Sequence, residues 1–230
     1  QLNMSADGQG GRNSGGGLGI GGTGTGGTVN LVATDGLIST GIGVSLSLDG
    51  TGGSVQGGTR AGAGFGGNAL VSADTGMIDV TGNFLINARG FGGIGDLGIN
   101  GGDGTGGGAA FAVNAAGGLI SIGGVTSLTV QGIATSGIGI GVGSGTGTGG
   151  NANLTATGGS IITGGRIDLI ATGSMGHGAV GSQTLARGGI ANVLVNGGAI
   201  SIGGELTVDA RATRSNPFTA DYNGGSAQGG

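Results

Sequence analysis

The sequence contains no cysteine, tryptophan or lysine, and it has only one proline and one tyrosine among its 230 residues. Without cysteine, the fold cannot rest on a disulfide framework. The scarcity of proline and the lack of a strict three-residue glycine period exclude a collagen triple helix. The net charge is −4 at pH 7, so the chain lacks the basic stripe that nucleic-acid binding requires. We therefore expect neither a disulfide scaffold nor a collagen-like or nucleic-acid-binding protein.

Long apolar runs and targeting segments are also missing. No stretch approaches the roughly 20 apolar residues of a membrane-spanning helix, and the first residues show neither a signal peptide nor a basic targeting segment. Charged residues make up only 8% of the chain, and the mean hydropathy is +0.28. Because disordered chains combine low hydrophobicity with high net charge, these values favour an ordered protein.

Glycine is abundant instead, and the 68 glycines belong to a repeat of about forty residues. The clearest copy, residues 158–171, reads GGSIITGGRIDLIA, and residues 117–130 and 197–210 have the same pattern. A central isoleucine marks each copy, at spacings of 40, 42, 41 and 39 residues: Ile38, Ile78, Ile120, Ile161 and Ile200. A period of this length indicates a stacked array of structural units.

Apolar residues alternate with other residues on both sides of every marker isoleucine, as Ile167, Leu169 and Ala171 do after Ile161. A period of two inside the longer repeat predicts β-strands. We therefore predict an all-β fold, a right-handed parallel β-helix (β-solenoid), forming one segment of a longer array over residues 1–230. The expected divisions are a partial repeat 1–7, repeats 8–49, 50–89, 90–131, 132–172 and 173–211, and an irregular tail 212–230.

The glycine-rich half of each repeat leaves the number of coils open. It either forms a second, slimmer coil or extends as a loop or flexible linker. Ile138, Ile140 and Val142 alternate with glycines, as do Leu97 and Ile99, and apolar residues in alternation need a core to enter. This alternation favours two coils per repeat. With a single coil, Asp49 and Arg89 would instead lie about 4.8 Å apart and pair directly.

Residues with catalytic or metal-binding potential are few and scattered. The one histidine, His177, stands among glycines in SMGHGAV, and no acidic residue clusters with an aromatic residue that would hold a sugar. Asp96 and Asp103 do not fit the glycine-rich calcium nonapeptide, so they are expected to be solvated turn residues. Phe218 and Tyr222, close to Pro217 in the tail, are expected to be packing residues. We predict no catalytic, cofactor-binding or metal-binding residue, and no enzymatic activity.

The alternating strand pattern followed by GG-x-I-x-x-GG resembles the repeat regions of filamentous haemagglutinin-like adhesins. It is also similar to autotransporter passenger regions and to other glycine-rich β-strand-repeat surface proteins of Gram-negative bacteria. The resemblance covers nearly the whole chain and implies a right-handed parallel β-helix, export as an unfolded chain, and a role at the cell surface. It carries over no functional residue, because shaft repeats of these families have none of fixed identity.

Together these features predict a structural or adhesive shaft segment of a secreted or cell-surface adhesin, or of a matrix fibre, attached to the outer membrane or extracellular. The expected partners are neighbouring repeats of the same parent chain, host or abiotic surfaces, glycans, or other copies of itself. An alternative is an ice- or crystal-binding solenoid, although Thr23, Thr25, Thr28, Thr146 and Thr148 form no single column through all repeats. A polysaccharide-active β-helix is the third hypothesis.

Overall fold

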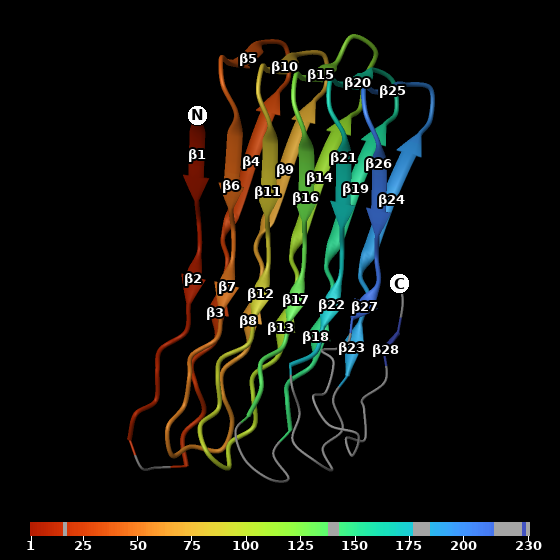
Figure 1. The fold of residues 1–230 in the computed structure, drawn as a ribbon. Helices are drawn as coiled ribbons and strands as arrows, with labels where there is room; N and C mark the ends of the chain where they lie inside the picture. The colour runs from red at the N-terminus through yellow and green to blue at the C-terminus, as the bar shows by residue number, and fades with distance from the viewer. Residues whose placement is uncertain (16–17, 138–142, 177–184, 214–226, 229–230) are drawn as a thin grey trace.

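The chain forms a β-solenoid in which parallel strands from successive repeats lie side by side (Figure 1). The computed structural model describes residues 1–15, 18–137, 143–176, 185–213 and 227–228. Within these residues there are five parallel sheets and no helix. The first five coils each contribute one strand to every sheet, and strands β26, β27 and β28 belong to a sixth coil. The predicted all-β solenoid is therefore confirmed.

Three sheets, which we call core sheets 1 to 3, surround the wide half of each coil. Core sheet 1 contains β1 (Leu2–Ser5), β6 (Val44–Ser47), β11 (Phe84–Asn87), β16 (Thr126–Thr129), β21 (Ile167–Ile170) and β26 (Leu206–Asp209). Core sheet 2 contains β4 (Thr28–Ala33), β9 (Asn68–Ala73), β14 (Gly108–Val113), β19 (Asn151–Ala156) and β24 (Ile190–Val195). Core sheet 3 contains β5 (Leu37–Thr40), β10 (Met77–Val80), β15 (Leu119–Ile122), β20 (Ser160–Thr163) and β25 (Ala199–Ile202).

Two sheets of two-residue strands, which we call glycine sheets 1 and 2, form the narrow half of each coil. Glycine sheet 1 contains β2 (Gly8–Gln9), β7 (Gly50–Thr51), β12 (Gly90–Phe91), β17 (Gly132–Ile133), β22 (Gly173–Ser174) and β27 (Ala212–Thr213). Glycine sheet 2 contains β3 (Gly24–Thr25), β8 (Gly64–Phe65), β13 (Gly104–Thr105), β18 (Gly147–Thr148), β23 (Ala186–Arg187) and β28 (Ala227–Gln228). In Figure 1 these short strands continue the long ones towards the loops at the bottom of the view.

The marker isoleucines form one column, as predicted. Ile78 pairs with both Ile38 and Ile120, and Ile161 pairs with both Ile120 and Ile200. Strands of consecutive repeats are therefore direct neighbours, and each repeat makes one coil. The prediction of two coils per repeat is wrong, because the glycine-rich half closes the same coil instead of starting another.

The wide half of the coil holds the apolar core. Alternate residues of the core sheets point inward and are almost completely buried in the middle coils, as the burial of Leu128, Leu154 and Ile167 shows. The rings of Phe84 and Phe111, from core sheets 1 and 2, meet edge to face with centroids 4.9 Å apart. Contacts of this kind join opposite sheets of the coil, and burial of apolar surface supplies the main stabilisation of this half.

Where the two glycine sheets face each other there is no side-chain core, because their backbones are in contact. The buried side chains of Val55, Ala61 and Ile99 lie outside these short strands. A Cβ atom built on Gly64 would overlap the carbonyl oxygen of Phe91, and one on Gly104 would overlap the carbonyl oxygen of Ile133. Only glycine allows backbones to approach this closely. The glycine content of the chain is thus a consequence of direct packing between two layers of main chain.

Backbone hydrogen bonds connect the two layers. Near the loops they zigzag from coil to coil, through Gly53 N–H to Gly22 O (2.8 Å), Gly62 N–H to Gly53 O (2.8 Å), Gly93 N–H to Gly62 O (2.8 Å) and Gly102 N–H to Gly93 O (2.9 Å). Where the wide half begins, Gly67 N–H donates to Leu48 O (2.7 Å) and Gly107 N–H donates to Ala88 O (2.8 Å). Buried backbone groups that do not pair within a sheet thereby find partners across the coil.

The narrow half gains side chains towards the C-terminal coils. Gly10, Gly52 and Gly92 stand two residues after the first residue of their short strands, and Ala134 and Met175 occupy the same place in the next two coils. Ala134 and Met175 are both buried. Ile138, Ile140 and Val142, on which the prediction of a second coil partly rested, lie outside the described residues.

Buried hydroxyls interrupt the core in two columns, at Thr126 in core sheet 1 and at Thr40 and Thr163 in core sheet 3. Thr126 stands in the inward column of core sheet 1 between Phe84 and Ile167, and its hydroxyl has no hydrogen-bond partner. An unpaired buried polar group costs about 1–3 kcal/mol. A Thr126→Val substitution, which keeps the shape, is therefore expected to raise the free energy of unfolding by about 1 kcal/mol in urea denaturation. Thr129→Val, at an outward position of the same strand, is the control, and equal effects of the two substitutions would contradict the assignment.

Candidate binding surfaces

A column of polar side chains runs along the solenoid where core sheet 1 meets glycine sheet 1, from the exposed Asp7 to the exposed Arg211, with Thr172 buried between its neighbours. Its members come from successive coils: Asp7, Asp49, Arg89, Gln131, Thr172 and Arg211. Backbone hydrogen bonds hold these positions side by side, since Gly8 N–H donates to Asp49 O and Gly50 N–H donates to Arg89 O. The polar column therefore repeats at the spacing of neighbouring strands.

Asp49 and Arg89 form the ion pair that a single coil per repeat predicts. Arg89 Nη2 lies 2.6 Å from Asp49 Oδ2, and Arg89 Nε lies 3.2 Å from both carboxylate oxygens. The Arg89 N–H also donates to Asp49 Oδ1 at 2.9 Å. Both side chains are partly buried, so this pair is better defined than a fully exposed one.

Asp7 is held by hydrogen bonds and has no ion pair among the described residues. Its Oδ2 accepts from the Ser5 hydroxyl, and its Oδ1 accepts from the Ser47 hydroxyl and the Asp49 N–H, each at 2.7 Å. Desolvation raises the pKa of Asp7, but these three hydrogen bonds and the positive charge of Arg89 together hold that pKa below its ordinary value. The carboxylate is therefore ionised at neutral pH.

Acidification is expected to destabilise the protein through Asp7 and Asp209. A hydrogen bond from Arg211, and the charge of that residue, lower the pKa of Asp209 despite partial desolvation. Since both pKa values are lowered by folding, the unfolded chain takes up protons at higher pH than the folded chain. The stabilisation is complete above the ordinary carboxyl pKa of about 3.9 and is lost as the pH falls through the lower folded values.

Urea midpoints between pH 7 and pH 2.5 measure this effect. Asp7→Asn is expected to lose less stability on acidification than the unsubstituted chain. Asp79→Asn serves as control, because the Asp79 carboxylate has no hydrogen bond or ion pair among the described residues. An equal loss in Asp7→Asn and the unsubstituted chain would contradict a contribution from Asp7.

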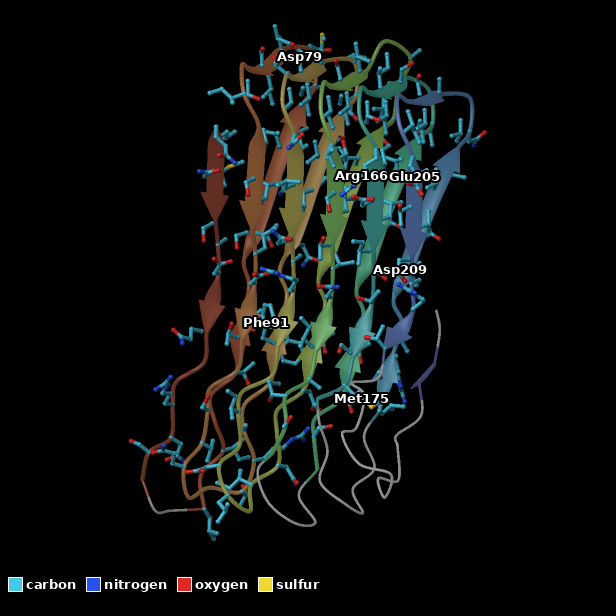
Figure 2. The ribbon with its side chains drawn as sticks, viewed as in Figure 1. Asp79, Phe91, Arg166, Met175, Glu205 and Asp209 are labelled. Atoms are coloured by element: carbon cyan, nitrogen blue, oxygen red, sulfur yellow. The ribbon has the colours of Figure 1, made fainter. Side chains whose placement is uncertain are left out.

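A groove of about 450 Å³ lies beside Asp7, and its lining consists of Asp7, Gly8, Gln9, Asp49, Thr51 and Phe91. Figure 2 labels Phe91 on β12, on the outer face of the narrow half. The structure thus places an aromatic side chain beside two carboxylates, and the expectation that no such cluster exists is wrong. The repeat spacing could have revealed this cluster. Gln9, Thr51 and Phe91 each follow a member of the polar column by two positions, so they line up in neighbouring coils.

Asp7 differs from the acid residue of a glycoside hydrolase. Those enzymes need one carboxylic acid that stays protonated, with a raised pKa, to donate a proton to the leaving group. The pKa of Asp7 is lowered, and Asp49 is bound to Arg89. The two carboxylates can accept hydrogen bonds and attract positive charge.

No known protein family, curated protein or solved structure matches the chain. None of the residues that the structure describes forms a helix able to cross a membrane. The outer faces and grooves of the solenoid are the surfaces through which it can contact other molecules.

The two aspartates considered for calcium have different partners. Asp96 is in a loop, where its side chain accepts a hydrogen bond from the Leu97 N–H at 2.8 Å. Asp103 is paired with Arg60 at 2.5 Å and also accepts from the Thr146 N–H. Over the described residues there is no group of three or more acidic or histidine side chains that could hold a metal ion. His177, Pro217, Phe218 and Tyr222 lie outside those residues.

A second hollow, of about 300 Å³, lies among the loops of the first three coils. Its lining consists of Arg12, Asn13, Ser14, Ser54, Val55, Gln56, Ile94 and Asp96. Isolated bridges from Asn13 to Val55 and from Val55 to Gly95 keep these loops in register. The loops therefore continue the stacking of the sheets.

The outer face of core sheet 2 carries no charged side chain. Its outward positions over five coils are Thr28, Asn30, Val32, Asn68, Leu70, Ser72, Gly108, Ala110, Ala112, Asn151, Asn153, Thr155, Ile190, Asn192 and Leu194. Asn192 donates to Asn153 at 3.1 Å, which links side chains of neighbouring coils. This uncharged face contrasts with the polar column, which contains Asp7, Asp49, Arg89 and Arg211.

Threonines do not line up as a lattice-binding face would need. The outward column of glycine sheet 2 contains Thr25, Thr105 and Thr148, but Phe65 and Arg187 interrupt it. Ice or crystal binding through a continuous threonine array is therefore not favoured by the register.

Proposed function

We propose that the chain is a shaft segment of a secreted or cell-surface adhesin, or of an extracellular matrix fibre, and that it acts through its repetitive outer faces. The observation that carries this proposal is the unbroken register of five sheets through every coil. Each coil is bonded along the stacking axis to its neighbours, which is the geometry of a structural repeat array.

The contrast between inward and outward positions supports a surface role. Most inward positions stay apolar from coil to coil, as Leu46, Ile86 and Leu128 do, and Thr126 is an exception. The outward polar column changes from aspartate to arginine, glutamine and threonine over the same coils. A scaffold of this kind holds its interior constant while its outer faces present different groups to partners.

The extracellular location belongs to the same proposal. It is supported by the resemblance of the repeat to surface proteins of Gram-negative bacteria. Proposed partners are neighbouring repeats, host or abiotic surfaces and glycans. Antibody labelling of intact cells that produce the protein tests the location, and labelling only after cell lysis would contradict it.

Single-molecule force measurements test the structural role. When the chain is pulled by its ends, we expect coils to detach in steps that each release about one repeat, roughly 140 Å of extended chain. Extension without force peaks would contradict a load-bearing shaft.

Bead adhesion tests the binding role independently. Beads coated with the chain are expected to adhere to at least one of three surfaces, mineral, polysaccharide or matrix protein, more strongly than albumin-coated beads. If chain-coated beads adhered no more strongly than albumin-coated beads on any of the three surfaces, the adhesive role would be contradicted.

A further inference from the structure

We propose that the groove between Asp7 and Phe91 binds an amino sugar, a pyranose that carries a free ammonium group and hydroxyls. This inference deepens the proposed adhesive function by naming a ligand class for one outer face. It rests on that function only for the claim that the face is exposed to glycans. The lining residues come from three neighbouring coils, so the site exists only in the stacked solenoid.

The charge of the groove calls for a cationic ligand. The negative charge of Asp49 is balanced by Arg89 at 2.6 Å, whereas Asp7 has no ion pair among the described residues. Asp7 is nevertheless fixed in place by the three hydrogen bonds from Ser5, Ser47 and the Asp49 backbone. An ionised carboxylate accepts about four hydrogen bonds, so roughly one acceptor position of Asp7 stays open. An ammonium group fits this position, because it donates hydrogen bonds and carries a positive charge.

The aromatic wall suits the same ligand. The Arg89 guanidinium carbon lies 5.1 Å from the centroid of the Phe91 ring, so one cation already contacts this ring. Phe91 also lines the groove, where it offers apolar surface to the carbon skeleton of a sugar. Because Arg89 is itself held by Asp49, the ring is positioned before any ligand arrives.

Two other polar side chains of the groove favour a sugar over a simple amine as the ligand. Gln9 and Thr51 line the groove, and neither side chain has a hydrogen-bond partner in the part of the chain that the structure describes. An amide and a hydroxyl can both donate and accept, which matches sugar hydroxyls. A lysine side chain carries an ammonium group but no hydroxyls, so it would leave both groups unsatisfied. The groove volume of about 450 Å³ lies within the range of ligand sites.

The test is an NMR titration of the intact ¹⁵N-labelled chain with four probes. These are glucosamine oligosaccharides, N-acetylglucosamine oligosaccharides, cellulose-derived oligosaccharides without nitrogen, and N-acetyl-lysine amide. We expect the glucosamine oligomers to shift the resonances of residues 7–9, 49–51 and 89–91, with at least tenfold weaker binding of the other three. Equal binding of the acetylated or nitrogen-free sugars would overturn the role of the ammonium group. Equal binding of the lysine derivative would overturn the assignment to a sugar.

Two variants locate the site, each with a matched control. Phe91→Ile should retain the fold, because isoleucine already occupies the paired position of the next coil, at Ile133. The variant should bind the glucosamine oligomers at least tenfold more weakly. The control is Phe65→Ile, at an exposed position on the opposite sheet.

Asp7→Asn should weaken binding at least tenfold, while Asp79→Asn should leave it unchanged. Unaltered binding in Phe91→Ile and Asp7→Asn would overturn the proposal. The force measurement and bead adhesion to mineral or matrix protein would stand, because neither depends on this groove.

Discussion

Gly104→Ala is expected to lower the free energy of unfolding by about 3 kcal/mol or more, at the upper end of the range for overpacked sites. Gly104 stands in the middle of glycine sheet 2, paired with Gly64 and Gly147. An added Cβ would overlap the carbonyl oxygen of Ile133 and come within 2.5 Å of the Gly90 carbonyl oxygen. Both are backbone atoms bonded into sheets, so they cannot move aside as a flexible side chain would.

Gly41→Ala is the matched control. An added Cβ at Gly41 meets no atom within 4 Å, so its effect should be within about 0.5 kcal/mol, as for most surface substitutions. Chemical denaturation of the two variants measures the difference. A Gly104→Ala variant as stable as Gly41→Ala would show that the two layers do not pack as closely as described.

Ile161→Asp is expected to cost about 4 kcal/mol or more, because it buries an unpaired charge in the core. Ile161 is 1% exposed and pairs with Ile120 and Ile200 in the column of marker isoleucines. Its neighbour on the same strand, Ile162, points outward and is 44% exposed. Ile162→Asp makes the same chemical change at a solvated position.

The pair of variants separates burial from strand propensity, because both place aspartate in β20. We expect Ile162→Asp to stay folded, with a loss of about 1 kcal/mol or less from the lower β-propensity of aspartate. Circular dichroism and urea denaturation measure both. Similar losses in the two variants would contradict the assignment of Ile161 to the interior.

Much of the wide half was predictable from sequence. The two-residue alternation identifies the inward positions, and the repeat spacing aligns them. The column from Ile38 to Ile200 is therefore confirmed residue by residue. Side-chain burial determines this half, and burial leaves a periodic pattern in the sequence.

The narrow half was harder to predict because backbone contact leaves no apolar pattern. Alternating Leu97 and Ile99 indicated a second core, yet Leu97 is 77% exposed and only Ile99 is buried. Layers joined by main-chain hydrogen bonds need no apolar side chains. The prediction of two coils per repeat was wrong for this reason.

The groove beside Phe91 was missed for a different reason. Its residues are separated by about forty positions in the chain, and they meet only when consecutive repeats are stacked as single coils. With two coils per repeat, Asp7, Asp49 and Phe91 would not share a surface. An error in the number of coils therefore concealed the site.

The backbone contact between the glycine sheets also affects how stability varies with temperature. The positive heat capacity of unfolding comes from apolar surface, and exposure of polar surface lowers it. Unfolding of the narrow half exposes mainly peptide groups, because Gly64, Gly104 and their neighbours contribute no side chains. The heat capacity change per residue should therefore be smaller than in a protein with an apolar core throughout. The stability curve of such a solenoid is correspondingly flat, so that cooling and moderate warming change its free energy of unfolding only slightly.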